Sequence, residues 1–473
     1  MHTTDEPASS QEFQEAPESG EAPAGAQPEP LSLTDRARAM PTSATLSINE
    51  AVAQRRAAGQ EIVHLGFGEA AFPLHPKLKT ALADAATRTG YAPMLGLPTL
   101  RAAIAAYLTP TRGTPYRAEQ IAVGPGSKPL LYALLQVLEG DVLLPIPSWV
   151  SYQPMARLAN KRVIATPTAP DDRHSLTPDV LTQTLDCARQ DGADPRILLV
   201  NSPSNPTGGM FAPEDVQALA AWARDAGITI ISDEIYAELA HGPREHVSPA
   251  RFYPEGAIVT GGLSKAFSAG GWRLGYAALP ATAAGEAVMA AVRSLAGEIW
   301  SAAATPIQEA ALVAFSPDAD LETYVQRSAR VHAAVTGQLY DRLTRLGVPC
   351  PRPNGAFYLY PDFSPWQAAL QRRGVTTSEE LARHLLEQWG IATLPGSAFN
   401  EAPTALRLRL ATSLLCEPDG APAPGERDAA LRRILDLAGQ AGALDASGGQ
   451  SPLFPALERA VARWAAVIGD WEH

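Results

Sequence analysis

One lysine stands in an unusual setting. The stretch TGGLSKAFSAGGWRLGY, residues 260–276, places Lys265 among glycine, serine and alanine, with Arg273 eight residues later. The chain has 38 basic residues, of which five are lysine and the other 33 are arginine. Lysine carries a primary amine whose proton can be lost, whereas arginine stays protonated. The stretch therefore marks Lys265 as a candidate for chemistry that needs a primary amine.

Three other expected strand ends carry polar residues. The run GPGSK, residues 124–128, follows QIAV and leads into a helix, where free N–H groups suit a phosphate, although ordinary turns also contain glycine. The run NPTG, residues 205–208, comes after RILLV. An ordinary turn is the alternative to a ligand-binding role for this run. Asp233 follows ITII, with Tyr236 three residues on. A carboxylate there needs a cation or a proton, unless it only caps a helix.

These strand ends belong to a regular alternation of elements. Short apolar runs such as DVLLPIP and GAIVTGGLS alternate with helical patterns through the middle of the chain. This order is typical of an α/β fold with a mainly parallel central sheet and helices on both faces. Ligands bind such sheets beyond the carboxyl ends of the strands, where the polar residues lie. We expect a large domain over residues 76–315 and a smaller α+β domain over residues 316–440, and we expect the N-terminal segment 36–75 to join the small domain.

Both ends of the chain differ from this core. Residues 1–35 are acidic and rich in Pro, Ala, Gly, Ser and Glu, so we expect a disordered arm, with no signal peptide. Residues 441–473 form a linker and a helix in which Leu457, Trp464 and Trp471 recur on one face. We favour packing of this helix on its own subunit over a role in binding a partner.

The bulk composition excludes several classes of protein. A net charge of -12 and a pI near 5.3 argue against a nucleic-acid or membrane surface, because phosphate binding needs clustered cations. No apolar run is long enough to span a membrane. Cys187, Cys350 and Cys416 lie far apart, without metal-ligand spacing or an obvious disulfide pattern. We therefore expect no metal site and a reducing, cytoplasmic location.

Taken together, the motifs resemble those of a known family. NPTG, SDEIY and SKAFSAGGWRLGY have the order and spacing found in class I/II aminotransferases of fold type I, which use pyridoxal 5'-phosphate. The resemblance is closest to the aspartate/prephenate branch and covers residues 37–413. It implies an enzyme that moves an amino group between an L-amino acid and a 2-oxo acid.

The resemblance also implies roles for the candidate residues. Lys265 would form the Schiff base with the cofactor and afterwards move a proton. Asp233 would pair with the pyridinium nitrogen, while Asn205 and Tyr236 would hydrogen-bond the phenolic oxygen. The other cofactor contacts implied are Gly126, Ser127, Lys128, Ser264 and Arg273 around the phosphate, and Trp149 stacked on the ring. One departure is Gly262, which replaces a serine that often contacts the phosphate.

Substrate contacts are implied in the same way. Gly68 and Arg407 would hold the α-carboxylate, with Trp149 and Asn205 nearby. In ALRLRLATS, Arg409 would point to the same side of a strand, but the place of Arg407 relative to ATS matches the family. Tyr91 corresponds to a tyrosine that the neighbouring subunit gives to the cofactor phosphate. The resemblance thus implies a homodimer with shared active sites.

The donor and the reaction have alternatives. Lys128, Ser43 and Thr45 favour an acidic donor, slightly ahead of an aromatic one. The aromatic alternative would use a pocket wall built from Trp149, Trp300, Phe357 and Tyr358. The same cofactor supports C–S β-lyases, decarboxylases and oxidative deaminases, because it stabilises any carbanion at the substrate Cα. A non-catalytic regulator that reuses the fold is disfavoured, because Lys265, Asp233 and Arg407 occur together and no basic DNA-binding domain is present.

Overall fold

The computed structural model describes most of the chain. It covers residues 31–38, 40, 42–70, 72–168, 170, 174–243, 245–418, 423–440, 442–444 and 453–472. Residues 1–41 and residues 42–473 form separate compact units, and the short helix α1 (Asp35–Arg38) belongs to the first. Residues 1–30 of the expected disordered arm and most of the expected linker lie outside the described residues.

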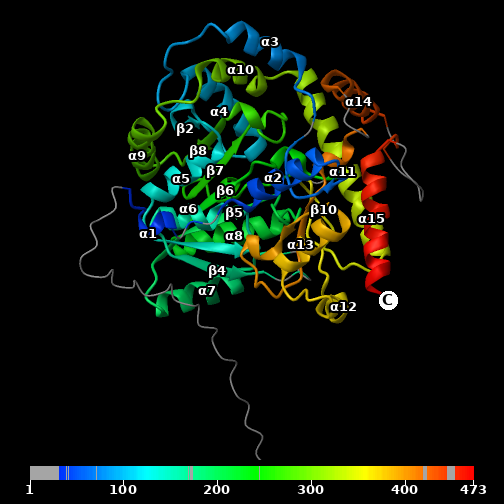
Figure 1. Ribbon diagram of the computed structural model, residues 1–473. Helices are drawn as coiled ribbons and strands as arrows, with labels where there is room; N and C mark the ends of the chain where they lie inside the picture. Colours follow the sequence, from blue (N-terminus) through cyan, green and yellow to red (C-terminus); the bar gives the residue numbers. More distant parts are fainter. Residues whose placement is uncertain are drawn as a thin grey trace, which may run out of the picture. The chain divides into compact units, whose positions relative to one another are not determined.

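A seven-stranded sheet forms the centre of the described part of the second unit (Figure 1). Its strands follow the order β2-β8-β7-β6-β5-β3-β4. They are β2 (Ile121–Gly124), β3 (Asp141–Ile146), β4 (Val163–Pro167), β5 (Pro195–Asn201), β6 (Thr229–Asp233), β7 (Ala257–Gly262) and β8 (Gly275–Ala278). Neighbours are parallel except where β8 pairs with β2 and β7. The prediction of a mainly parallel sheet is confirmed.

The sheet is apolar on both faces because successive side chains of a strand point in opposite directions. Leu143 and Leu198 belong to one buried cluster, whereas their neighbours Leu144 and Leu199 belong to another. Helices α3 (Pro76–Ala85), α4 (Pro98–Arg112), α7 (Pro178–Gln190), α8 (Pro213–Ala226) and α10 (Thr305–Phe315) supply the first cluster. Helices α5 (Ser127–Val137), α6 (Tyr152–Leu158) and α9 (Ala283–Ile299) supply the second. The prediction of helices on both faces is confirmed.

The remaining elements build a smaller α+β region around the long helix α11 (Ala319–Arg345). Strands β9 (Tyr358–Leu359), β11 (Leu394–Pro395) and β12 (Leu408–Ala411) pair antiparallel, and β1 (Val63–His64) pairs parallel with β10 (Ile391–Ala392). The helices of this region are α2 (Ala44–Ala57), α12 (Gln367–Arg372), α13 (Ser378–Trp389), α14 (Pro424–Leu437) and α15 (Pro455–Trp471). Because residues 42–473 form one compact unit, the expected domain boundaries stay a prediction.

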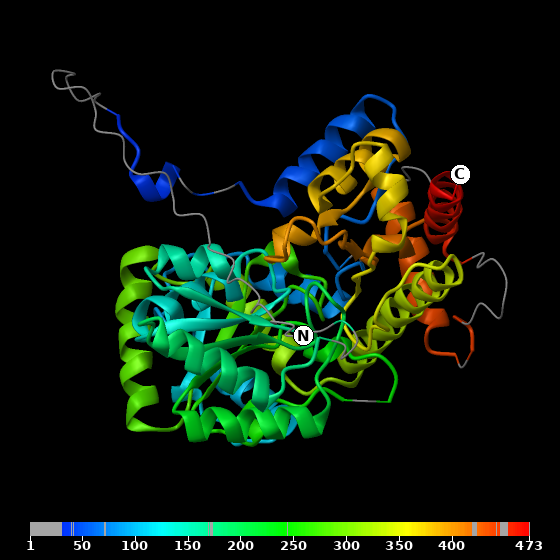
Figure 2. The ribbon, with the colours of Figure 1, turned by 90° about the horizontal axis from the view of Figure 1, so that it is seen from below.

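The C-terminal helix α15 packs on its own chain. Figure 2 shows it in red beside α11, with which it is in contact. Trp464 and Trp471 are buried in the core of the smaller region, and Trp464 stacks on Phe363 with ring centroids 5.2 Å apart. Arg463 Nη1 also donates to the backbone oxygen of Glu61, at 2.9 Å. The favoured interpretation of this amphipathic helix is therefore confirmed.

Within the described residues, none of the helices combines the length and apolar character that crossing a membrane requires.

Candidate active site

A cavity of about 400 Å³ opens beyond the carboxyl ends of β5, β6 and β7. Ten of the residues expected at the site line it: Gly68, Ser127, Lys128, Trp149, Asn205, Asp233, Tyr236, Ser264, Lys265 and Arg273. Tyr358 and Arg409 close the cavity from β9 and β12, and Ser43, Thr45 and Leu46 line it near the start of α2. Residues far apart in sequence thus converge where the polar strand ends meet.

Lys265 follows β7 and reaches into this cavity. Its Nζ donates to the backbone oxygen of Gly68 at 2.6 Å and lies 5.7 Å from the ring centroids of Tyr236 and Phe357. Burial lowers the pKa of the Lys265 amine to about 8, since removal from water disfavours the charged form. A substantial fraction of the amine is therefore neutral near pH 8 and able to act as a nucleophile.

Asp233 ends β6 and is buried. Its Oδ2 accepts a hydrogen bond from Tyr152 Oη at 2.8 Å, and its Oδ1 accepts one from Thr260 Oγ1 at 3.3 Å. Burial raises the pKa of the carboxyl to about 6, although both hydrogen bonds act in the opposite direction. A carboxylate in such surroundings favours a cationic partner, which a protonated ring nitrogen can provide.

The start of α5 forms a cradle for an anion. Gly126 has φ +100°, and a Cβ at this position would overlap the guanidinium of Arg273, so glycine is required there. α5 begins at Ser127, where its free N–H groups and its dipole favour negative charge. The cradle therefore fits a phosphate group.

Gly262 departs from the family pattern for a steric reason. A Cβ at this position would come within 2.6 Å of the backbone oxygen of Leu274, the residue just before the neighbouring strand β8. A serine therefore cannot replace this glycine unless the neighbouring backbone shifts.

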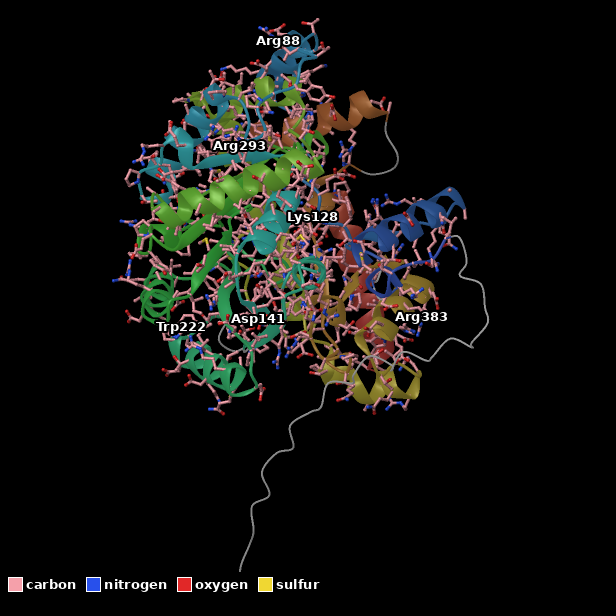
Figure 3. All side chains as sticks on the ribbon, turned by 90° about the vertical axis from the view of Figure 1, so that its left-hand side faces the viewer. Arg88, Lys128, Asp141, Trp222, Arg293 and Arg383 are labelled. Atoms are coloured by element: carbon pink, nitrogen blue, oxygen red, sulfur yellow. The ribbon has the colours of Figure 1, made fainter. Side chains whose placement is uncertain are left out.

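Lys128 and Trp149 form a cation–π contact in the cavity lining. Lys128 Nζ lies 4.9 Å from the ring centroid of Trp149. Burial lowers the pKa of Lys128, and the charge of Arg273 acts in the same direction. Figure 3 shows Lys128 at the start of α5, on the side that faces α2.

Three side chains from different elements meet beside Lys265. Tyr236 and Tyr358 share a hydrogen bond of 2.7 Å between their hydroxyls, and Asn205 Nδ2 donates to Tyr358 Oη at 3.4 Å. Of the four aromatic residues expected in the wall, Trp149 and Tyr358 belong to the described lining, whereas Trp300 and Phe357 do not. A Cβ at Gly68 would overlap the Tyr358 hydroxyl, which explains the glycine.

The choice of Arg407 for this cavity is wrong. Arg407 lies just before β12, where its guanidinium meets Glu401 Oε1 at 2.7 Å and Asp362 Oδ2 at 3.3 Å. Arg409 lines the cavity instead, donating to Asn205 Oδ1 at 3.5 Å and to the backbone oxygen of Gly66. The ATS motif correctly indicated the strand that carries the arginine. It did not indicate which of the two arginines, Arg407 or Arg409, reaches the cavity.

Arg409 is a buried cation in the cavity lining. Only 2% of the residue is exposed, and no carboxylate of the described residues lies within 4 Å of it. Burial lowers the pKa of Arg409 relative to a free guanidinium. Because an unpaired buried charge is costly, this position favours an anionic ligand, which a guanidinium can hold with two N–H groups.

Sequence reasoning missed several residues of the cavity. Tyr152 holds Asp233, and Asn201 Nδ2 donates to the backbone oxygen of Asp233 at 2.8 Å. Asn201 ends β5, so the rule that drew attention to the other strand ends could also have found it. Tyr91 is 97% exposed and is not among the described lining residues.

The sheet, the lysine beyond β7 and the acidic residue at the end of β6 together define a pyridoxal-phosphate-dependent enzyme of fold type I. Comparison with known proteins then assigns the family: residues 60–414 match the model for aminotransferase class I and II. The chain belongs to this family and is a pyridoxal-phosphate-dependent aminotransferase of the aspartate/prephenate branch.

Several relatives match this chain over most of its length. The aspartate aminotransferase of Geobacillus stearothermophilus is 34% identical over 395 residues, which is 81% of this chain and 95% of the relative. The aspartate/prephenate aminotransferase of Thermus thermophilus is 34% identical over 388 residues, or 80% of this chain and 94% of the relative. A structure of Thermus thermophilus aspartate aminotransferase with maleate matches with a TM-score of 0.73 at 31% identity, covering 86% and 98% of the two chains.

Proposed function

We propose that the cavity at Lys265 is the active site and that it transfers the amino group of an acidic amino acid. The observation that carries this proposal is the buried Arg409, which lines the cavity with Lys265 and has no acidic partner among the residues that the structure describes. The site combines a cation for an α-carboxylate with a base close by. Bound pyridoxal phosphate supplies the aldehyde that receives the amino group and the ring that accepts electrons from the substrate Cα.

The residues around Lys265 have separate tasks in this proposal. Lys265 Nζ, with its lowered pKa, takes the proton from the substrate Cα and would return it to C4' of the cofactor, the carbon that carries the aldehyde. Asp233 holds the ring nitrogen in its protonated form. Asn205 and Tyr236 donate hydrogen bonds to the phenolic oxygen of the ring. The phosphate and ring face are held by Gly126, Ser127, Lys128, Ser264, Arg273 and Trp149.

In this proposal Arg409, and not Arg407, binds the α-carboxylate of the substrate. Its two terminal nitrogens can bind both oxygens of an α-carboxylate, which fixes the orientation of the Cα–H bond relative to the ring. Gly68 and Asn205 line the same part of the cavity.

Support for an acidic donor comes from three polar residues of the cavity lining. Lys128 lines the cavity together with Ser43 and Thr45, which lie at the start of α2. A distal carboxylate would pair with the Lys128 ammonium and accept hydrogen bonds from the hydroxyls. The relatives from Geobacillus stearothermophilus and Thermus thermophilus carry the name of an aspartate-using enzyme, which agrees with this donor. An aromatic amino acid is the second candidate, because Trp149 and Tyr358 also line the cavity.

The assembly and location are part of the same proposal. We infer a homodimer in which Tyr91, almost fully exposed on one chain, reaches the phosphate site of the other. Residues 76–315 and 316–440 would act as the large and the small domain. Three free cysteines in the described chain agree with a reducing cytoplasm.

A trapping experiment tests the role of Lys265. The cofactor-loaded protein is reduced with borohydride, digested and analysed by mass spectrometry, while a second sample is titrated with single amino acids and followed by absorbance. We expect the cofactor on the peptide containing Lys265 and a spectral change that is largest with aspartate or glutamate. Lys265→Ala should fold, bind cofactor reversibly and lose transamination. A label on another lysine, or substantial turnover by Lys265→Ala, would refute the assignment.

A further inference from the structure

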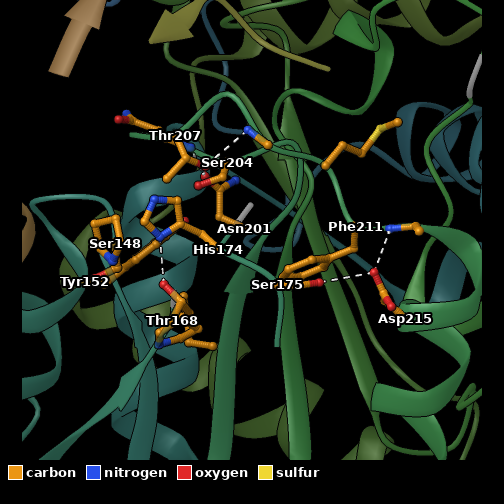
Figure 4. A pocket seen from close by; sticks show the side chains of 17 residues that line it. Ser148, Tyr152, Thr168, His174, Ser175, Asn201, Ser204, Thr207, Phe211 and Asp215 are labelled. Atoms are coloured by element: carbon orange, nitrogen blue, oxygen red, sulfur yellow. Dashed lines mark hydrogen bonds between the residues drawn. The ribbon is translucent and has the colours of Figure 1, made fainter. Parts of the chain in front are cut away.

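A second cavity adjoins the candidate active site, and Figure 4 shows the side chains that line it. Its volume is about 50 Å³, and it shares Tyr152, Asn201 and Asn205 with the first cavity. The other side of the second cavity is formed by residues that follow β4 and by the first turn of α8, including His174, Ser175 and Asp215. This volume is enough for roughly three water molecules, since one water needs on the order of 15 Å³ of such space.

His174 faces this cavity in a fixed protonation state. Thr168 Oγ1 lies 2.9 Å from His174 Nδ1, and the same hydroxyl donates its hydrogen to the backbone oxygen of Ile146. Because a hydroxyl has one hydrogen, Thr168 must accept the second hydrogen bond from His174. Nδ1 of His174 therefore carries the proton, and Nε2 presents a lone pair.

The imidazole is neutral as well as buried. Burial lowers the pKa of His174 to about 4, and the charge of Arg407 acts in the same direction. Only 8% of the residue is exposed. Nε2 is thus a hydrogen-bond acceptor over the whole range near neutral pH.

No protein group of the described residues satisfies this acceptor. The Ser175 hydroxyl, which also lines the cavity, donates to Asp215 Oδ2 at 3.1 Å (Figure 4). A buried acceptor without a donor is unfavourable, so the geometry calls for a small donor inside the cavity.

We propose that the second cavity is a binding site for a cluster of ordered water molecules, one of which donates to His174 Nε2. Water fits both the volume and the chemistry, because it donates to the imidazole and can also contact the amide groups of the shared wall. The cluster would support Asn201, whose Nδ2 donates to the backbone oxygen of Asp233 and whose Oδ1 accepts from Asn205 N at 2.7 Å. His174 and its water are therefore a positioning network behind Asn205 and Asp233.

Crystallography of the cofactor-loaded protein, at a resolution that shows ordered water, tests the site. We expect a water within hydrogen-bond distance of His174 Nε2 in the wild type and in the control Ser175→Ala. That water should be lost in His174→Leu. A cavity without density at Nε2, or a protein donor bound to Nε2, overturns the proposal. The wild-type density decides this question even if His174→Leu does not fold.

An absorbance titration tests the positioning role, which rests on the proposed function of Asn205. Loss of the water loosens Asn205, so the pH at which the visible spectrum of the cofactor-loaded protein changes should rise in His174→Leu. Ser175→Ala should keep the wild-type value. An unchanged value in His174→Leu overturns the positioning role, whereas the crystallographic result stands independently of the proposed function.

Discussion

Two arginines separated by one residue have different surroundings, and the difference decides their roles. Arg407 is paired with Glu401 and Asp362, so its charge is neutralised within the chain. Arg409 is buried beside Asn205 and Tyr358 and needs a partner. Position in a motif suggested the first arginine, whereas the electrostatic balance selects the second.

Arg409→Gln should strongly impair transamination. Loss of two charge-assisted hydrogen bonds to the substrate costs about 3–4 kcal/mol, which is roughly a 100- to 1000-fold decrease in kcat/KM. Arg407→Gln is the matched control and should stay within about tenfold of the wild type, because its partners lie outside the described cavity lining. Steady-state kinetics with aspartate and 2-oxoglutarate measures both. The reverse ranking would restore the original choice.

Cofactor binding should weaken as the pH falls below about 6. The pKa of Asp233 is raised to about 6 by burial, so below that pH the carboxyl is protonated in the free protein. The ring nitrogen is also protonated, and one proton must leave when the pair forms, so Kd rises by up to about tenfold per pH unit. Fluorescence titration of the apo-protein between pH 5 and 8 measures this.

Asp233→Asn is the control for this titration. It retains any contribution from the cofactor phosphate but lacks the carboxyl, so its Kd should be higher at neutral pH and less dependent on pH. Equal slopes for the variant and the wild type would show that Asp233 does not pair with the ring.

Among the elements, β6 and α5 carry the most important positions of the site. β6 is the central strand of the seven, fourth from either edge of the sheet, so Asp233 emerges from the protected interior. α5 follows β2 after a turn whose glycine has a positive φ, which aims the helix N-terminus at the cavity. Strand ends position the acid, and a helix start provides the anion cradle.

Helix α15 lies outside the matched family region but stabilises the smaller region. Trp464→Ala should lower the free energy of unfolding by about 3–5 kcal/mol, because it removes a buried indole stacked on Phe363. Ala465→Gln, on the exposed side of the same helix, should change it by less than about 0.5 kcal/mol. Denaturant titration followed by fluorescence or circular dichroism compares them. Equal stability of all three proteins would mean that α15 does not pack as described.

At the scale of the whole molecule, the proposed homodimer makes the site depend on two chains. Tyr91 is exposed although it is a large aromatic residue, as expected for a contact with another subunit. A monomer would leave Tyr91 without a task in catalysis. The oligomeric state therefore decides whether the described cavity is complete.

Hybrid dimers test this sharing of sites. Tyr91→Ala and Lys265→Ala chains are each impaired, but a dimer with one chain of each kind contains one site with both wild-type residues. A refolded equal mixture should thus recover about a quarter of wild-type activity when free cofactor is high enough to fill the intact sites, since about half of the dimers are hybrids and each has one intact site. Light scattering should give the mass of a dimer. Activity equal to the sum of the separate variants would contradict shared sites.

The sequence by itself determined the class of fold and which strands end in polar residues. It also determined four residues of the candidate site, namely Lys265, Asp233, Asn205 and Tyr236. These could be predicted because alternation of apolar strands and helices forces the carboxyl ends of parallel strands to one edge, and because the residues lie in short local motifs. The reversed direction of β8 and the pairing of β1 with β10 could not be read locally, since strand pairing depends on distant segments.

Only the tertiary structure decided between Arg407 and Arg409 and brought Tyr152, Asn201 and Tyr358 to the cavity. It likewise revealed His174 behind the shared wall. The physical reason is that burial and charge pairing arise from contacts between elements far apart in the chain. A motif states which side chains are present, but the free energy of each charge depends on the neighbours that folding provides.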